Sequence, residues 1–206
     1  MANKTLVYHV DDLPDSIKVS EVIAVDTEAM GLNNHRDRLC LVQLSSGDGV
    51  VHLIHFKSSS KYSAPNLKRI LENDKVLKVF HFARFDVAIL QRYLSVEINS
   101  IYCTKIASRL ARTYTDCHGL KDLCMDLLGI RLSKQQRLSD WGSDTLTPEQ
   151  LEYASNDVLY LHELREALDI MLAREGRSKI AKKCFESLPT IAYLDLLGWS
   201  ENIFEH

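Results

Sequence analysis

The sequence lacks the features of a membrane or secreted protein. None of its apolar runs approaches the ~20 residues that a membrane helix needs, and the opening MANKTLVYHVDD contains no hydrophobic signal-peptide core. The five scattered cysteines form no Cys-x-x-Cys pair, which argues against zinc and redox motifs. Scattered free thiols are typical of a reducing compartment. We therefore expect a cytoplasmic protein that does not bind membranes.

An excess of charge of one sign is also absent. The chain has 25 basic and 28 acidic residues and a net charge of -3, so no global positive field attracts nucleic acid. A nucleic-acid partner would have to be held locally, by a basic rim or by metal ions. The length of 206 residues, 46% of them hydrophobic, suits one core. We expect a single domain over 1–206, with its last roughly 30 residues as a helical C-terminal extension.

The order of apolar segments predicts an α/β fold, a mixed β-sheet flanked by α-helices. The tight turn SGDG at 46–49 predicts an antiparallel pairing of the strands on either side. Thr147, Pro148 and Gln150 have the pattern of a capping box that opens a long helix. Strands are expected at 21–28, 38–45, 49–56, 75–80 and, in a short form, 97–104; helices are expected at 64–73, 83–94, 103–113, 119–128 and 147–175.

Carboxylates interrupt three of these apolar patterns. Asp26 and Glu28 share one side of a strand because side chains alternate with period two. Asp86 falls on the apolar stripe of helix 83–94. Tyr153 and Asp157 lie one turn apart on the stripe of the long helix. Each feature alone has an ordinary structural explanation, namely a solvated strand end, a helix cap or a buried Tyr–Asp hydrogen bond.

Taken together, the four carboxylates indicate a metal site. Four inward-facing acids would destabilise the fold without cations, and an oxygen-only ligand set suits hard divalent ions. We expect two ions, Mg²⁺ or Mn²⁺, held by Asp26, Glu28, Asp86 and Asp157 at a separation of roughly 3.5–4 Å, the arrangement that serves phosphoryl displacement. Tyr153 is then placed to orient the attacking water.

The same residues, in their order, resemble the DEDDy 3′→5′ exonucleases and most closely ribonuclease D. The motifs are DTEAMGL, HFARFD, LSDW and LTPEQLEYASNDVLYL, spread over residues 20 to 170. This resemblance implies an RNase H-like fold. It also implies that Leu32 is a wedge beside the terminal base, and that His81 and Phe82 line the pocket for the last nucleotides. The chain would be a short form without the helical RNA-binding domains of larger ribonuclease D proteins.

Further substrate contacts are predicted in the polar loop 131–146. Lys134 and Arg137 are candidates for phosphate contacts, and Trp141 for base stacking or for anchoring the loop to the core. The basic segment 174–183 is either an RNA contact or a solvated helix face. Asp144 and Thr145 stand where the family often has Arg-Pro, which is a departure from the pattern.

The sequence thus predicts a metal-dependent 3′→5′ exoribonuclease that releases nucleoside 5′-monophosphates from single-stranded RNA 3′ ends, tRNA precursors among them. Two alternatives remain at this stage. One is a DNA 3′→5′ exonuclease of the proofreading or repair type, since RNA and DNA differ at the 2′-OH. The other is a catalytically silent nucleic-acid-binding protein with this fold. The oligomeric state is not defined by the sequence.

Overall fold

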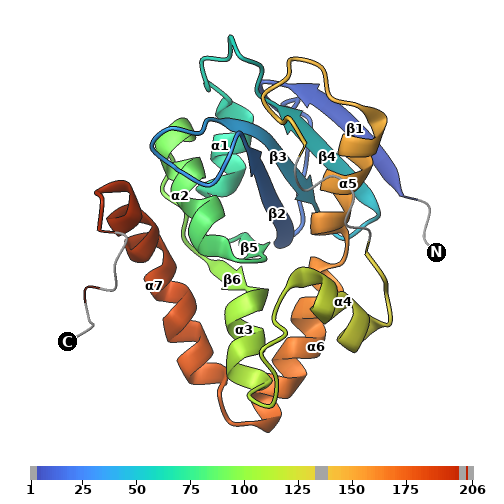
Figure 1. The fold of residues 1–206 in the computed structure, drawn as a ribbon, viewed down its shortest axis with the longest axis vertical. Coiled ribbons are helices and arrows are strands. Elements are labelled where there is room, and N and C mark those ends of the chain that lie inside the picture. Colours follow the sequence, from blue (N-terminus) through green and yellow to red (C-terminus); the bar gives the residue numbers. More distant parts are fainter. Residues whose placement is uncertain (1–3, 133–138, 200–202, 204–206) are drawn as a thin grey trace.

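A mixed sheet forms the centre of the computed structural model, which describes residues 4–132, 139–199 and 203. The six strands of this described part lie in the order β1-β4-β3-β2-β5-β6 (Figure 1). Strand β3 pairs antiparallel with β2 and β4, and the other neighbours are parallel. The predicted hairpin at 46–49 is therefore confirmed. The strands are β1 (Thr5–Val10), β2 (Val22–Ala29), β3 (Leu39–Ser45), β4 (Val50–His55), β5 (Leu77–Phe80) and β6 (Ile101–Cys103).

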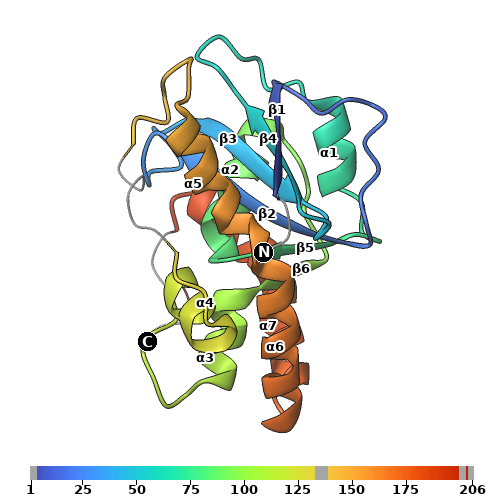
Figure 2. The same cartoon turned by 90° about the vertical axis from the view of Figure 1, so that its right-hand side faces the viewer.

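Helices cover both faces of this sheet. Figures 1 and 2 place α1 and α2 on one face and α5 on the other, while α3, α4 and α6 gather beside the sheet at its β6 end. Helix α7 packs along α2. The helices are α1 (Pro65–Leu71), α2 (Ala83–Leu94), α3 (Thr104–Ala111), α4 (Leu120–Leu128), α5 (Pro148–Leu159), α6 (Leu161–Arg174) and α7 (Ser178–Leu196).

Buried strands could be predicted from the sequence more readily than exposed ones. Every residue of β3 is buried, so its run of Leu, Val and Cys reads as a central strand. Strand β1 was not predicted. It is an edge strand with exposed and partly buried residues, and Tyr8 and Val10 are both more than 40% exposed. A half-exposed edge strand gives a weaker apolar signal than a central one.

The prediction of one long helix over 147–175 is wrong, because the helix is interrupted at Tyr160. This residue (φ -106°, ψ 1°) is both the C-cap of α5 and the N-cap of α6. Helix α5 lies on β2, β3 and β4, whereas α6 packs against α3 and α4. The residues near the break include no Gly or Pro, so the change of direction follows from packing on two different surfaces.

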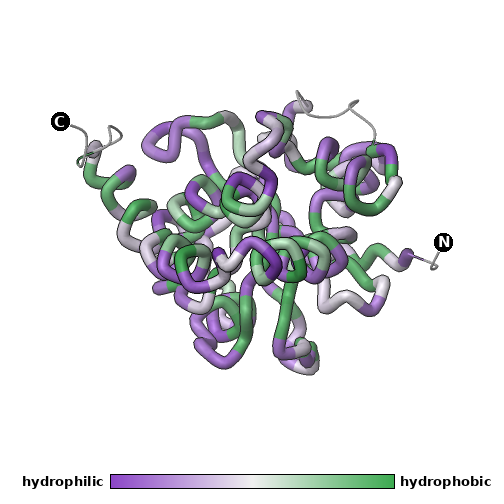
Figure 3. Tube along the Cα trace, turned by 90° about the horizontal axis from the view of Figure 1, so that it is seen from below, coloured by the Kyte–Doolittle hydropathy of each residue, from purple (hydrophilic) through white to green (hydrophobic). Residues whose placement is uncertain are grey.

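The C-terminal helix shares the core of the sheet. Figure 3 shows hydrophobic and hydrophilic stretches alternating along most elements, and one buried hydrophobic cluster includes residues from the strands and from α7, such as Phe185 and Leu188. Helix α7 continues through Pro189. Among the described residues, no helix has both the length and the apolar character that a membrane crossing requires.

Candidate active site

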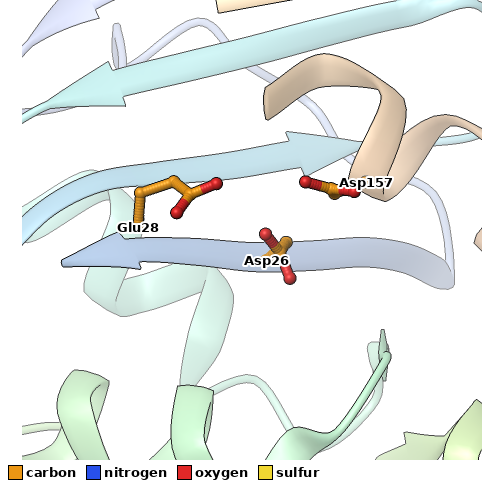
Figure 4. Close-up of side chains that lie close together, drawn as sticks. All are labelled: Asp26, Glu28 and Asp157. Atoms are coloured by element: carbon orange, nitrogen blue, oxygen red, sulfur yellow. The ribbon is translucent and has the colours of Figure 1, made fainter. Parts of the chain in front are cut away.

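Two acidic side chains project from the central strand β2 toward helix α5. Asp26 and Glu28 share one face of β2, and Asp157 approaches them from the last turns of α5 (Figure 4). Each of the three offers a carboxylate oxygen, and these atoms lie within 4.8 Å of one another. They come from distant parts of the sequence, so the fold itself assembles this group, which we call the carboxylate cluster.

Both ends of α5 are held in place. At its start, the Thr147 hydroxyl accepts a hydrogen bond from the Gln150 backbone N–H (3.3 Å), and the Gln150 side chain accepts one from the Thr147 N–H (2.9 Å). The predicted capping box is therefore confirmed. Further along, the Lys4 ammonium donates to Ser155 Oγ (2.9 Å) and Asn156 Oδ1 (3.2 Å). These bonds fix the helix that carries Asp157.

Asp86 reaches the same region from the opposite face of the sheet. Strand β5 pairs only with the first residues of β2, up to Ala24, so the rest of that edge of β2 has no strand beside it. The first turn of α2 carries Asp86. There the Thr27 hydroxyl donates to Asp86 Oδ1 at 2.6 Å. Asp86 is 4% exposed and lies beside the carboxylate cluster rather than within it.

Burial raises the pKa values of all four acids, and repulsion from neighbouring carboxylates adds to the rise for Asp26, Glu28 and Asp86. Burial is the main cause for Asp26, followed by the charges of Asp86, Asp157 and Glu28, and its pKa lies well above the usual range. Glu28 behaves in the same way. Burial raises the pKa of Asp86 to about 7 against the opposing hydrogen bond from Thr27. It also raises the pKa of Asp157 to about 7.

This arrangement fits a divalent cation. Carboxylates held in a shielded place at close range repel each other unless a cation or protons neutralise them. Their oxygens are the ligands that Mg²⁺ and Mn²⁺ prefer. Among the described residues, Asp26, Glu28 and Asp157 bring their oxygens close enough together to bind one ion jointly. Asp86 lies close enough to act on their charges.

Two aromatic residues lie next to the cluster. Tyr153 precedes Asp157 by one turn of α5, and its ring centroid lies 6.3 Å from that of Trp141. The Trp141 indole is only 3% exposed, which leaves no face for a nucleotide base. The structure therefore favours loop anchoring over base stacking for Trp141.

An open cavity of about 600 Å³ lies between the loop after β2, the start of α2 and the end of α7; its lining includes Phe85, the neighbour of Asp86 in the chain, but none of the four acids. Leu32 lines it and is 85% exposed. Its loop is held by Asp37, which accepts from the Asn33 N–H (3.0 Å). At Gly31 a Cβ would lie 2.2 Å from Asp37 Oδ2, so a side chain at this position would displace the Asp37 carboxylate. The exposed position of Leu32 thus belongs to a well-bonded loop.

The cavity wall from α2 begins at a strained residue. Phe82 is the N-cap of α2 with φ 66°, is 48% exposed, and has the Lys105 ammonium 4.1 Å from its ring centroid. Such backbone strain in non-glycine residues often marks functional sites. His81 lies behind it and shares a hydrogen bond with Thr104 Oγ1 (2.9 Å). Burial lowers the pKa of His81 to about 4, so its imidazole is neutral.

The end of α7 forms the third wall of the cavity and is bonded to α2. The Arg84 guanidinium donates to both carboxylate oxygens of Asp195 on α7, each at 2.6 Å. Arg84 and Asp195 both line the cavity. The sequence analysis missed this pair, because the two residues lie far apart in the chain and nothing local links them.

The predicted loop contacts are only partly visible. Lys134 and Arg137 lie outside the described residues. Asp144, the departure from the family pattern, accepts hydrogen bonds from the Ser58 N–H (2.7 Å) and hydroxyl (3.0 Å). Arg38 donates to the Gly142 carbonyl (2.7 Å). Asp144 therefore serves to attach the loop to the body of the protein.

A cation near Asp157 was also missed. The charge of Lys121, in the first turn of α4, opposes the rise in the pKa of Asp157. Its signal in the sequence is faint, because one Lys in a helical pattern is ordinarily a surface residue.

An acidic cluster on the central strand of a mixed sheet is the architecture of RNase H-like nucleases. A family model described as 3′-5′ exonuclease matches residues 8–173, and the chain belongs to this family. The ribonuclease D of Nitrobacter hamburgensis is 33% identical over 156 residues, which cover 76% of this chain and 40% of the relative. The chain thus spans about two fifths of the length of that curated relative.

Solved structures of two other nucleases are also similar to this chain. Brucella melitensis NrnC bound to pGG is 48% identical with a TM-score of 0.93, over 98% of this chain and 99% of that one. The same protein with bound Mg²⁺ gives 48% and 0.92 over the same shares. Escherichia coli RNase D, at 23% identity and a TM-score of 0.72, covers 84% of this chain and 45% of that one and shows the shared fold. The predicted fold class and family resemblance are therefore confirmed.

Proposed function

We propose that this chain is a metal-dependent 3′→5′ exoribonuclease that releases nucleoside 5′-monophosphates. The observation that carries the proposal is the carboxylate cluster, three acids with oxygens within 4.8 Å and with raised pKa values. Such a group is costly in a protein that only binds or packs. A catalytically silent binding protein therefore has less support than an enzyme.

The roles follow from position. Asp26, Glu28 and Asp157, with Asp86 beside them, hold two divalent cations, Mg²⁺ or Mn²⁺. When bound, such ions generate a nucleophile from water and neutralise charge on the phosphoryl oxygens. Tyr153 lies one turn from Asp157 and orients the attacking water through its hydroxyl. An ordinary phenol, with a pKa near 10, stays protonated at neutral pH, which suits this orienting role.

The adjoining cavity receives the 3′ end of the strand. Leu32 offers an exposed apolar surface beside the terminal base, and Phe82 and the neutral His81 line the place of the last nucleotides. Its volume of about 600 Å³ lies in the usual range for small-ligand sites. Lys134 remains a proposed phosphate contact.

We infer the length and type of the substrate from the similarity of this chain to a solved structure. NrnC of Brucella melitensis was solved bound to pGG, and we infer that this chain also accepts very short RNA of that kind. Longer single-stranded RNA 3′ ends, including those of tRNA precursors, are the wider class, and DNA is the alternative strand. We place this activity in the cytoplasm.

One time course tests the proposal. The purified chain is mixed with 5′-labelled RNA, DNA of the same sequence, or pGG, each with Mg²⁺, Mn²⁺ or EDTA, and Asp157→Asn serves as the inactive control. We expect stepwise shortening of RNA from its 3′ end that stops in EDTA and is slowed strongly by a 3′-phosphate. Cleavage of circular RNA at a comparable rate, or cleavage in EDTA, would contradict the proposal. Faster cleavage of DNA would favour the alternative strand.

A further inference from the structure

A glutamine without partners lies in the middle of the sheet. Gln43 on β3 is 0% exposed. Neither its amide nitrogen nor its amide oxygen has a hydrogen-bond partner among the residues that the structure describes. A buried amide without partners has lost its hydrogen bonds to water and gained none in return, which destabilises the fold. Among the polar side chains of β3, Ser45 has a hydrogen-bond partner whereas Gln43 has none, so Gln43 calls for a second role.

The register of the sheet places Gln43 beside the carboxylate cluster. Gln43 is the direct cross-strand partner of Asp26 in the antiparallel pair β2–β3. Directly opposed residues point to the same face, with Cβ atoms about 4.5–5.5 Å apart. Gln43 therefore shares the face of β2 and β3 that α5 covers. The corresponding partner of Glu28 is Leu41, which offers no polar group.

The amide is chemically suited to act on Asp26. A primary amide has two N–H donors and an acceptor oxygen, and a carboxylate bound to a cation keeps lone pairs for a second donor. Outer partners of this kind fix the orientation of metal-binding carboxylates and hold them in the ionised form. No other residue described in β3 places an unpaired polar side chain opposite the acids.

We propose that Gln43 is a positioning residue, whose amide N–H donates to the Asp26 carboxylate when that carboxylate holds a divalent cation. The inference rests on the proposed function, because it needs a cation at the cluster. It adds a residue that touches neither the substrate nor the cation and that acts through Asp26.

The test compares the same substitution at two glutamines. Gln43→Met removes the amide at nearly constant volume, and Gln91→Met on α2 is the matched control, since Gln91 Oε1 is also buried without a partner. Mn²⁺ binding is measured by electron paramagnetic resonance on the whole chain without nucleic acid. Loss of an outer partner weakens metal binding typically about 10–100-fold. We expect that loss for Gln43→Met and a value within about twofold of wild type for Gln91→Met.

A second measurement separates positioning from folding. In EDTA, Gln43→Met should melt at or above the wild-type temperature, because it removes an unpaired buried amide. Wild-type Mn²⁺ affinity in Gln43→Met, or an equal loss in Gln91→Met, overturns the inference and leaves the proposed function intact. A wild-type protein that binds no Mn²⁺, or that binds it equally well after Asp26→Asn, overturns both.

Discussion

The carboxylate cluster and the cavity beside it are built from different kinds of structure. The cluster comes from a central strand and a helix held at both ends, and its acids are partly buried. The cavity comes from a loop, a strained helix start and the end of α7, and Leu32 at its rim is 85% exposed. Chemistry that needs fixed distances sits on the rigid elements, whereas substrate contact is left to segments that can vary.

The largest expected effect is at the cluster. Asp26→Asn removes one charge from the metal site, and metal ions supply several kcal/mol of charge stabilisation. We expect turnover to fall by at least about 10³-fold, while the metal-free protein melts no lower than wild type because repulsion has decreased. Turnover of RNA and melting in EDTA are the measurements. Glu186→Gln on α7, a carboxylate with a side chain 62% exposed, is the control and should behave as wild type.

Tyr153→Phe should cause the second-largest loss of cleavage rate. Groups that orient or transfer protons contribute typically 10²–10⁴-fold, and we expect a single-turnover rate at the lower end of that range with substrate affinity nearly unchanged. Phe keeps the ring and its contact with Trp141. A rate within a few-fold of wild type, with a loss of about 0.5–1.5 kcal/mol of stability, would show that the hydroxyl serves packing alone.

A change in the cavity should instead affect binding. Leu32→Ala removes an apolar side chain whose burial against a base contributes about 1.5 kcal/mol, so substrate affinity should drop roughly tenfold. The rate at saturating substrate and the stability should stay the same, because the side chain is exposed. Ile170→Ala on α6, at 72% exposure, is the matched control. A fall in the saturated rate of Leu32→Ala would mean that cluster and cavity are not separable.

The last expected effect concerns the pH dependence of stability and leaves turnover aside. The pKa values of Asp86 and Asp157 are about 7 in the folded protein, against roughly 4 for unperturbed Asp. Between these values the folded state binds more protons than the unfolded one, so the free energy of unfolding falls as pH rises from about 4 to about 7. Melting in EDTA over this range should show the decline, and Asp157→Asn should make it shallower. A slope unchanged by Asp157→Asn would exclude this titration as its source.

The sequence was informative where local patterns carry the information. Alternation placed Asp26 and Glu28 on one side of a strand, and the capping box at Thr147 located the start of α5. The break at Tyr160 could not be predicted, because it depends on which surfaces the two helix halves meet. The pair Arg84–Asp195 and the register that sets Gln43 opposite Asp26 are also tertiary facts. They are invisible until strands and helices have been placed.

The distance along the chain between β2 and α5 has a consequence for synthesis. Asp26 and Glu28 leave the ribosome long before Asp157, and their strand must wait for α5 to cover it. A partly made chain therefore lacks the third carboxylate of the cluster, which Asp157 supplies. A cation that binds the cluster would stabilise the completed fold relative to any shorter chain.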